Sequence, residues 1–240
     1  MTEARPVGAP VENWTPAQTP EELVLEGRYA MLEPLRAEDH AETLYKQMRG
    51  HDWRWDYMGY GPFADFSAFR TWMAAQEGQP DPYFLAIKDR ETDTWVGFCS
   101  LLRVDPAAGS IEVGHITMSP RLQRTRAATD AMYLLMKWAF TSGYRRYEWK
   151  CNALNAPSRR AAQRLGFSYE GIFRQAGVVK GRNRDTAWLA AIDSEWPALR
   201  AAFETWLDPA NFDASGQQIE RLSALTRPVI VATDPSLAAD

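Results

Sequence analysis

The alternation of hydrophobic and polar residues predicts a strand and then a helix at the start of the folded part of the chain. Residues 29–35 suit a strand, and apolar residues recur at helical spacing over 39–48. A second helix is predicted over 65–76, where Gly78 follows it. Short turns rich in Asp, Thr and Gly then separate three apolar runs, so we expect neighbouring antiparallel strands there. These strands are predicted at 83–88, 95–104 and 110–118.

After Pro120 the pattern changes to helices that alternate with strands. Small and apolar residues at helical spacing predict a long helix that ends at Gly143. The order of elements indicates a mixed α/β fold. The elements that follow are predicted at 146–152 (strand), 156–165 (helix), 168–174 and 186–192 (strands) and 195–207 (helix).

The chain divides by composition into one domain and two extensions. Residues 1–26 are rich in Pro, Ala, Thr and Glu with little periodicity, which indicates an extended segment lying on the surface or on a partner. A single domain is expected over 27–207, since 240 residues can share one core. Residues 208–240 form a polar tail, in which 217–225 could be a short helix.

The overall composition excludes several classes of protein. Hydrophobic residues at 45% and charged residues at 24% are near globular averages, so disorder and fibrous repeats are not expected. Two cysteines, Cys99 and Cys151, provide neither a disulfide framework nor a metal cluster, and we expect no metal. The N-terminus lacks an apolar signal region, and no apolar run is long enough to span a membrane. A cytoplasmic protein that does not bind membranes is therefore predicted.

Positive charge is concentrated in one segment. Residues 121–184 contain 14 Lys and Arg but 3 Asp and Glu, although the net charge of the whole chain is −4. Such a segment suits a nucleic acid, an acidic partner or a phosphorylated small ligand. We do not expect a nucleic acid, because the arginines are interleaved with core positions instead of forming a stripe.

A candidate anion site lies where the strand 110–118 leads through a tight turn into the long helix. Backbone N–H groups and the positive end of a helix converge at such a point. Arg121, Arg124 and Arg126 surround it. The phosphate-loop spacing of nucleotide hydrolases is absent, and the only G-x-G, at 59–61, lacks its third glycine.

Four runs of sequence, in order, resemble the GNAT superfamily of acyl-CoA-dependent N-acyltransferases. They are Ile111-Glu-Val-Gly-His-Ile-Thr-Met-Ser-Pro120, Gln123-Arg-Thr-Arg-Ala-Ala-Thr-Asp-Ala131, Asn152-Ala-Leu-Asn-Ala-Pro-Ser158 and Arg164-Leu-Gly-Phe-Ser-Tyr-Glu-Gly171. The resemblance extends over about 27–192 and favours the Rim-type branch, whose members acetylate ribosomal-protein N-termini. It implies a mostly antiparallel, twisted sheet of about seven strands flanked by helices.

The resemblance also implies acetyl-CoA as co-substrate. The family's pyrophosphate loop, Q/R-x-x-G-x-G/A, reads Gln123-x-x-Arg126-x-Ala128 here, so an arginine replaces the expected glycine. That change reduces backbone freedom and adds charge beside the phosphates. The cofactor-binding residues it implies are Ile116, Met118, Gln123, Arg124, Thr125, Arg126, Ala127, Ala128, Thr129, Asn155 and Ser158. Helix capping is the alternative role for Asn155 and Ser158.

Glu112 occupies the position where several GNAT enzymes carry their general base. Strand alternation predicts that Glu112 and His115 point to opposite faces of the sheet. A supporting Glu paired with an arginine is the alternative for Glu112, and His115 is interpreted as a core histidine. The family's acid, a tyrosine, is replaced by Ala162, so Ser158 or a water would protonate the leaving thiolate.

A loop dense in aromatic residues occupies the segment that varies with substrate in this superfamily. We expect it to line the acceptor side of the cleft, with Asp52 or Asp56 holding the ammonium group of the acceptor. A plug of core aromatics is the alternative interpretation. The aromatic residues concerned are Trp53, Trp55, Tyr57, Tyr60 and Phe63.

These features together predict an N-acetyltransferase in which an amine attacks acetyl-CoA directly. The acceptor could be a protein N-terminus, an amino acid or peptide, an aminoglycoside-like antibiotic or an aminoacyl nucleotide. A degenerate module that binds coenzyme A as a sensor or scaffold is the alternative, suggested by Arg126 and the missing tyrosine. A homodimer is possible.

Overall fold

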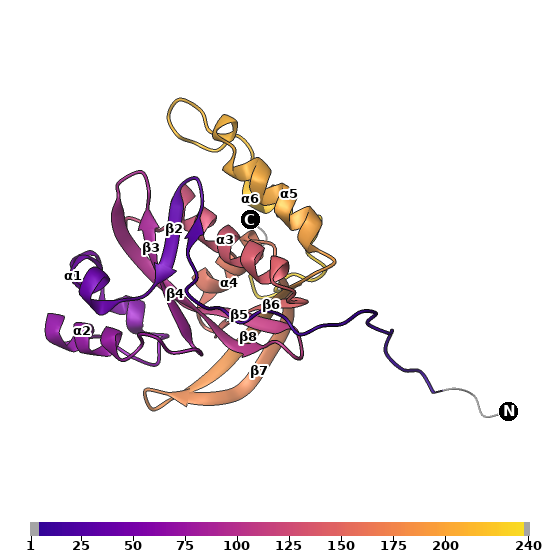
Figure 1. Cartoon of the computed structure of the whole chain (residues 1–240), viewed down its shortest axis with the longest axis horizontal. Helices are drawn as coiled ribbons and strands as arrows, with labels where there is room; N and C mark the ends of the chain where they lie inside the picture. The colour runs from indigo at the N-terminus through magenta and orange to yellow at the C-terminus, as the bar shows by residue number, and fades with distance from the viewer. Residues whose placement is uncertain (1–4, 238–240) are drawn as a thin grey trace.

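The computed structural model describes residues 5–237 and is built on one eight-stranded sheet in the order β1-β2-β3-β4-β5-β6-β8-β7 (Figure 1). The strands are β1 (Leu25–Glu26), β2 (Ala30–Pro34), β3 (Tyr83–Asp89), β4 (Thr94–Asp105), β5 (Ser110–Met118), β6 (Arg146–Asn152), β7 (Ser168–Val179) and β8 (Arg182–Ile192). The helices are α1 (Ala37–Met48), α2 (Phe66–Ala74), α3 (Arg126–Thr141), α4 (Ala156–Arg164), α5 (Trp196–Leu207) and α6 (Leu222–Thr226), with 3-10 turns η1 (Asp52–Trp55) and η2 (Pro209–Asn211).

The sheet is covered by helices on both faces, and each face has its own apolar core. Helices α1 and α2 pack on alternate side chains of β3 and β4, such as Phe84, Ala86 and Phe98. Helices α3, α4 and α5 pack on the opposite face, where the larger core includes Leu85, Leu101 and the β6 residues Tyr147 and Trp149. Figure 1 shows α1 and α2 at one side of the sheet and α5 and α6 beyond α3 at the other. This arrangement confirms the predicted mixed α/β fold with a mostly antiparallel sheet.

Strands β5 and β6 are the one parallel pair, and they remain together over only part of their length. Their register pairs Ser110–Val113 with Arg146–Trp149, whereas the other neighbouring strands are antiparallel. Beyond Val113 the remainder of β5 has no pairing with β6. The sheet therefore opens beside the C-terminal half of β5, next to the turn that enters α3.

An irregularity in β5 corrects the prediction that Glu112 and His115 point apart. The β4–β5 register shifts between the pairs Ser100–Gly114 and Phe98–Thr117, and His115 has φ of 51°. The extra residue of this bulge interrupts the alternation of side chains. The His115 ring consequently lies on the face of Ser100, whose Oγ is 2.8 Å from its Nδ1, and this is also the face of Glu112.

The last β-hairpin and the C-terminal helix differ from the sequence prediction. β7 and β8 reach Val179 and Arg182, whereas strands ending at 174 and beginning at 186 were expected. A register shift between Phe173 and Gly177 interrupts the alternation that marks a strand. The predicted helix at 217–225 is wrong in its first half, because α6 begins only at Leu222.

The N-terminal segment lies extended along the surface before β1. The backbone N–H groups of Ala17 and Gln18 donate to the carbonyls of Pro106 and Ser142, and Trp14 Nε1 donates to the carbonyl of Ala107. These contacts attach residues 14–18 to the β4–β5 turn and to the end of α3.

Candidate active site

The N-terminus of α3 directly follows the turn that leaves β5. Thr125 is the N-cap, and its Oγ1 accepts a hydrogen bond from the Ala128 N–H at 3.1 Å. Arg124 precedes it with φ of 64°, which turns the chain sharply into the helix. The first N–H groups of a helix have no partner within the helix, so Arg126 and Ala127 direct theirs outward. The arginine that replaces the family's glycine is thus compatible with a normal helix start.

A cavity of about 770 Å³ lies against this helix N-terminus. Of the predicted cofactor-binding residues, Met118 and every residue from Arg124 to Thr129 line it. Ile116, Gln123, Asn155 and Ser158 are outside its lining. The cavity wall also contains residues that the sequence did not indicate: Tyr29, Asp89, Glu91, Met132, Trp149, Ala161, Arg164, Leu165, Trp206, Phe212, Gly216, Gln217 and Gln218.

Asn155 and Ser158 have local structural contacts. Asn155 is the N-cap of α4, and its Oδ1 accepts from the Ser158 N–H at 3.2 Å, as the capping alternative predicts. Ser158 Oγ accepts from Trp149 Nε1 at 3.0 Å. Since Trp149 lines the cavity, Ser158 lies one side chain away from it.

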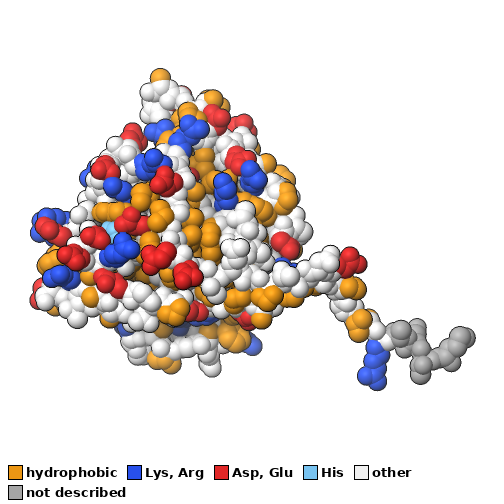
Figure 2. Space-filling view, in the orientation of Figure 1, with side chains coloured by type: hydrophobic (Ala, Val, Ile, Leu, Met, Phe, Trp, Pro, Cys, Tyr) orange, Lys and Arg blue, Asp and Glu red, His pale blue; other side chains and the backbone are white. Residues whose placement is uncertain are grey.

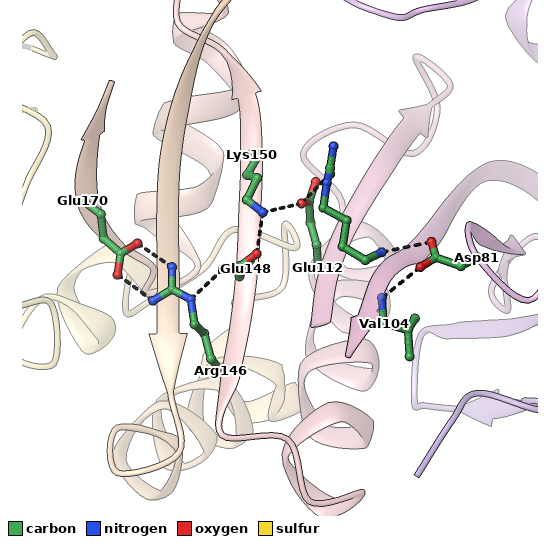
Figure 3. Close-up of polar contacts among 8 residues, drawn as sticks. Asp81, Val104, Glu112, Arg146, Glu148, Lys150 and Glu170 are labelled. Carbon is green, nitrogen blue, oxygen red and sulfur yellow. Dashed lines mark hydrogen bonds and ion pairs between the residues drawn. The ribbon is translucent and has the colours of Figure 1, made fainter. Parts of the chain in front are cut away.

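Glu112 belongs to a chain of ion pairs across four strands, which Figure 3 shows. Its Oε2 accepts from Arg103 at 2.6 Å and is 3.1 Å from Lys150 Nζ. Lys150 also donates to Glu148 at 2.6 Å, and Arg146 joins Glu148 on β6 to Glu170 on β7. Glu112 is 3% exposed and Lys150 is half-buried, so the pairing protects both charges from water. The prediction left open a Glu supported by an arginine, and that pairing is present.

Burial changes the proton affinities of both ionisable groups on this part of β5. Burial raises the pKa of Glu112, and the positive charges of Arg103 and Lys150 offset part of that rise. Burial lowers the pKa of His115 to about 4, and Arg103 and Arg184 add to the decrease. His115 is therefore neutral near pH 7, while the Glu112 carboxylate binds a proton more readily than an exposed one.

The aromatic loop divides into an inward and an outward set. Trp55, Tyr60 and Phe63 pack with one another and with Phe98 and Phe69 in the core beneath α1 and α2. Trp53 and Tyr57 instead are 59% and 36% exposed. The inward set has the contacts of a core plug, whereas the rings of the outward set are partly exposed to solvent.

Hydrogen bonds fasten this loop to three other parts of the molecule. Arg54 donates to the carbonyl of Met118 at the end of β5, and the Tyr57 hydroxyl donates to the carbonyl of Leu154 at 3.3 Å. Lys180, at the tip of the β7–β8 hairpin, donates to the carbonyl of Trp55 at 2.6 Å. The loop therefore spans the opening of the sheet on the face opposite to α3.

This topology places a cavity at the helix that follows β5 on one face of the sheet and the buried, ion-paired Glu112 on the other. The family model described as "Acetyltransferase (GNAT) domain" matches residues 30–168, and the chain belongs to this family. The match confirms the family-level resemblance, and members of the family use acetyl-CoA. The narrower resemblance to the Rim-type branch stays a prediction.

Three relatives illustrate the similarity. A GCN5-related N-acetyltransferase from Brucella melitensis is 45% identical with a TM-score of 0.88, covering 90% of this chain and 100% of its own. A GNAT-family protein from Chromobacterium violaceum is 41% identical with a TM-score of 0.76, covering 82% and 100%. Among curated proteins, the uncharacterized N-acetyltransferase p20 of Bacillus licheniformis is 29% identical over 146 residues, which are 58% of this chain and 80% of p20.

Residues 5–237 lack two structural features. They contain no group of three or more His, Cys, Asp or Glu side chains arranged to hold a metal ion. None of the helices in this part of the chain has the length and apolar character needed to cross a bilayer.

Proposed function

We propose that this protein transfers an acetyl group from acetyl-CoA to a primary amine by direct attack, without a covalent enzyme intermediate. The observation that carries the proposal is the cavity at the start of α3, which combines helix N–H groups with the guanidinium groups of Arg124, Arg126 and Arg164. Helix N-termini and arginines are suited to binding phosphates, and coenzyme A carries several. The residues present therefore fit the co-substrate of the family.

Each part of the cavity has a distinct role in this proposal. Arg124, Arg126 and the first turn of α3 would hold the phosphates, and Met118 and Trp149 would line the end of the cavity nearest to the opening of the sheet. Acetyl-CoA supplies an acyl group that is already activated as a thioester. The protein then has to position an amine and manage its proton.

Glu112 is proposed as the general base on the other face of β5. Its raised pKa lets the carboxylate take a proton from the acceptor's ammonium group, directly or through a water. Arg103 and Lys150 keep the carboxylate in place before and after that transfer. Ser158 or a water would return a proton to the leaving thiolate, and the Ser158 oxygen accepts a hydrogen bond from Trp149.

Trp53 and Tyr57 are proposed to contact the acceptor, because they are the outward members of the aromatic loop. Asp52 and Asp56 are exposed in the same loop and would attract an ammonium group. Trp55, Tyr60 and Phe63 would support the loop from beneath through their ring contacts. Acceptor preference should accordingly follow the two exposed rings.

The direct test is release of free thiol from acetyl-CoA in the presence of a panel of amines. The panel contains peptides with free N-termini, amino acids, aminoglycosides and aminoacyl nucleotides. We expect amine-dependent release with one of these classes, and with that acceptor Tyr57→Ala should raise KM for the amine but not for acetyl-CoA. If acetyl-CoA raises the Tm and no amine stimulates release, the protein is instead a coenzyme A-binding module.

A further inference from the structure

The segment from Trp206 to Gln218 closes one side of the cavity, although it lies outside the matched domain at 30–168. It runs from the end of α5 through η2 into a turn, at the top of the view in Figure 1. In the same orientation, Figure 2 shows Lys and Arg side chains beside a strip of hydrophobic side chains below this turn. The C-terminal segment thus shares the cavity wall with Arg124, Arg126 and Arg164.

The turn is built from specific contacts. Asn211 is buried; its Nδ2 donates to the carbonyls of Trp206 and Glu220, and its Oδ1 accepts from the Glu220 N–H at 2.7 Å. Phe212 and Gln218 form a β-bridge across the turn. The Trp206 Nε1 donates to Gln218 Oε1 at 2.7 Å. These bonds fix which side chains the turn presents to the cavity.

Two aromatic rings of this segment hold two arginines of the opposite wall. The Arg126 guanidinium lies 5.0 Å from the centre of the Phe212 ring and 4.8 Å from that of Tyr29. The Arg164 guanidinium lies 4.9 Å from the centre of the Trp206 ring, and it donates to Thr129 Oγ1 at 3.2 Å. A guanidinium that stacks on a ring keeps the N–H groups of its edge available to bind an anion.

The cavity lining combines two groups of residues with different chemistry. Met118 and Trp149 lie beside the opening of the sheet, across β5 from Glu112, where an acyl group would meet an amine. Phe212, Gln217 and Gln218 line the cavity from the C-terminal segment. An aromatic ring and side-chain amides are suited to stacking on a planar base and to hydrogen bonding with its edge.

We propose that the C-terminal segment 206–218 is the wall that binds the nucleotide end of coenzyme A, the adenosine 3′,5′-bisphosphate portion. This assignment rests on the proposed function, because it assumes that the cavity binds coenzyme A. Phe212 and the two glutamines contact the nucleotide, and Phe212 and Trp206 also position Arg126 and Arg164 against its phosphates. The extension is then part of the binding site and not an appendage of the domain.

The principal test is Gln218→Glu, measured by calorimetric titration with two fragments of the co-substrate. A carboxylate still accepts from Trp206, so the turn is kept, but a negative charge now faces the phosphates. We expect Kd for adenosine 3′,5′-bisphosphate to rise about tenfold or more, while Kd for 4′-phosphopantetheine stays within about twofold. Ile219→Glu is the matched control, because its exposed side chain adds the same charge one residue away, outside the cavity.

Phe212→Ala provides a second variant that removes the ring without adding charge. It should weaken binding of the nucleotide fragment and of acetyl-CoA together, with an unchanged Kd for 4′-phosphopantetheine. The inference is overturned if both variants bind the nucleotide fragment as the parent does, or if they lose both fragments equally. A parent protein that binds no acetyl-CoA at all would refute the proposed function, and with it this assignment.

Discussion

The α3 side of β5 presents cationic groups with few acidic partners, whereas the opposite side presents a carboxylate that already holds two cations. Arg124 forms no ion pair within residues 5–237, and Arg126 is 3.5 Å from Glu91. Glu112, in contrast, is buried between Arg103 and Lys150. One side is ready to receive an external anion, and the other is internally balanced.

This difference indicates two separate kinds of sensitivity to substitution. On the α3 side, the proposed function has an anionic ligand bind to the arginines, so changes there should act on affinity. On the opposite side, burial raises the pKa of Glu112 and the ion pairs offset part of that rise, so changes there should act on rate if Glu112 is the general base. Three variants test the two sides, the first two by rate and affinity and the third by stability.

The largest effect is expected from Glu112→Gln, which keeps the shape of the side chain and removes its basicity. If Glu112 is the general base, kcat should fall by about 10²–10⁴-fold at neutral pH, while Kd for acetyl-CoA changes little. Steady-state kinetics and calorimetry measure the two quantities. Glu170→Gln is the control, because Glu170 belongs to the same ion-pair chain but lies at its far, exposed end. A Glu112→Gln enzyme with the parent's kcat would assign the proton transfer to water or to another group.

A smaller effect, on affinity, is expected from Arg124→Glu combined with Arg126→Glu. Reversing two charges at the cavity should raise Kd for acetyl-CoA by about 100-fold, and the increase in Tm on adding acetyl-CoA should disappear. Arg121→Glu is the matched control in the same turn, since Arg121 does not line the cavity. Equal binding by the double variant and the parent would place the phosphates elsewhere.

The smallest effect concerns stability against pH. The pKa of His115 is lowered to about 4, so below its ordinary value of 6.5 the unfolded chain binds a proton that the folded protein does not. The contribution of neutral, buried His115 to the free energy of unfolding is complete above pH 6.5 and decreases as the pH falls towards 4. Between pH 7.5 and pH 5.5, the free energy of unfolding of His115→Asn should decrease by about 1 kcal/mol less than that of the parent. Asparagine is chosen because it tolerates the positive φ of this position. Urea unfolding at both pH values measures the difference between the two proteins, and identical pH dependence would contradict the assignment.

Much of the fold could be predicted because local patterns agree with the final structure. The strand at 146–152 and the strand at 110–118 have the boundaries that alternation predicts. The sequence also predicts the tight turn between the strand 110–118 and the long helix, because the turn and the start of the helix are formed by neighbouring residues. Local propensity and hydrophobic period determine such elements.

Two features of the candidate site could not be predicted, since they arise from contacts between distant segments. The bulge at His115 depends on how β5 pairs with β4, and a single-residue shift is enough to move a side chain to the other face. The cavity wall at Trp206 and Phe212 depends on where α5 packs against α3. A tryptophan at the end of a predicted helix and a phenylalanine in a polar tail are not by themselves a signal for a binding site.

The sandwich of Arg126 between Tyr29 and Phe212 has a consequence for how the protein is made. The three residues are far apart in the sequence, so these contacts have a high contact order. During synthesis the chain cannot complete this wall until Phe212 has left the ribosome. If segment 206–218 binds the ligand as proposed, a nascent chain would acquire its full affinity only after Phe212 has emerged, and ligand binding would then stabilise the assembled fold instead of one early-folding part.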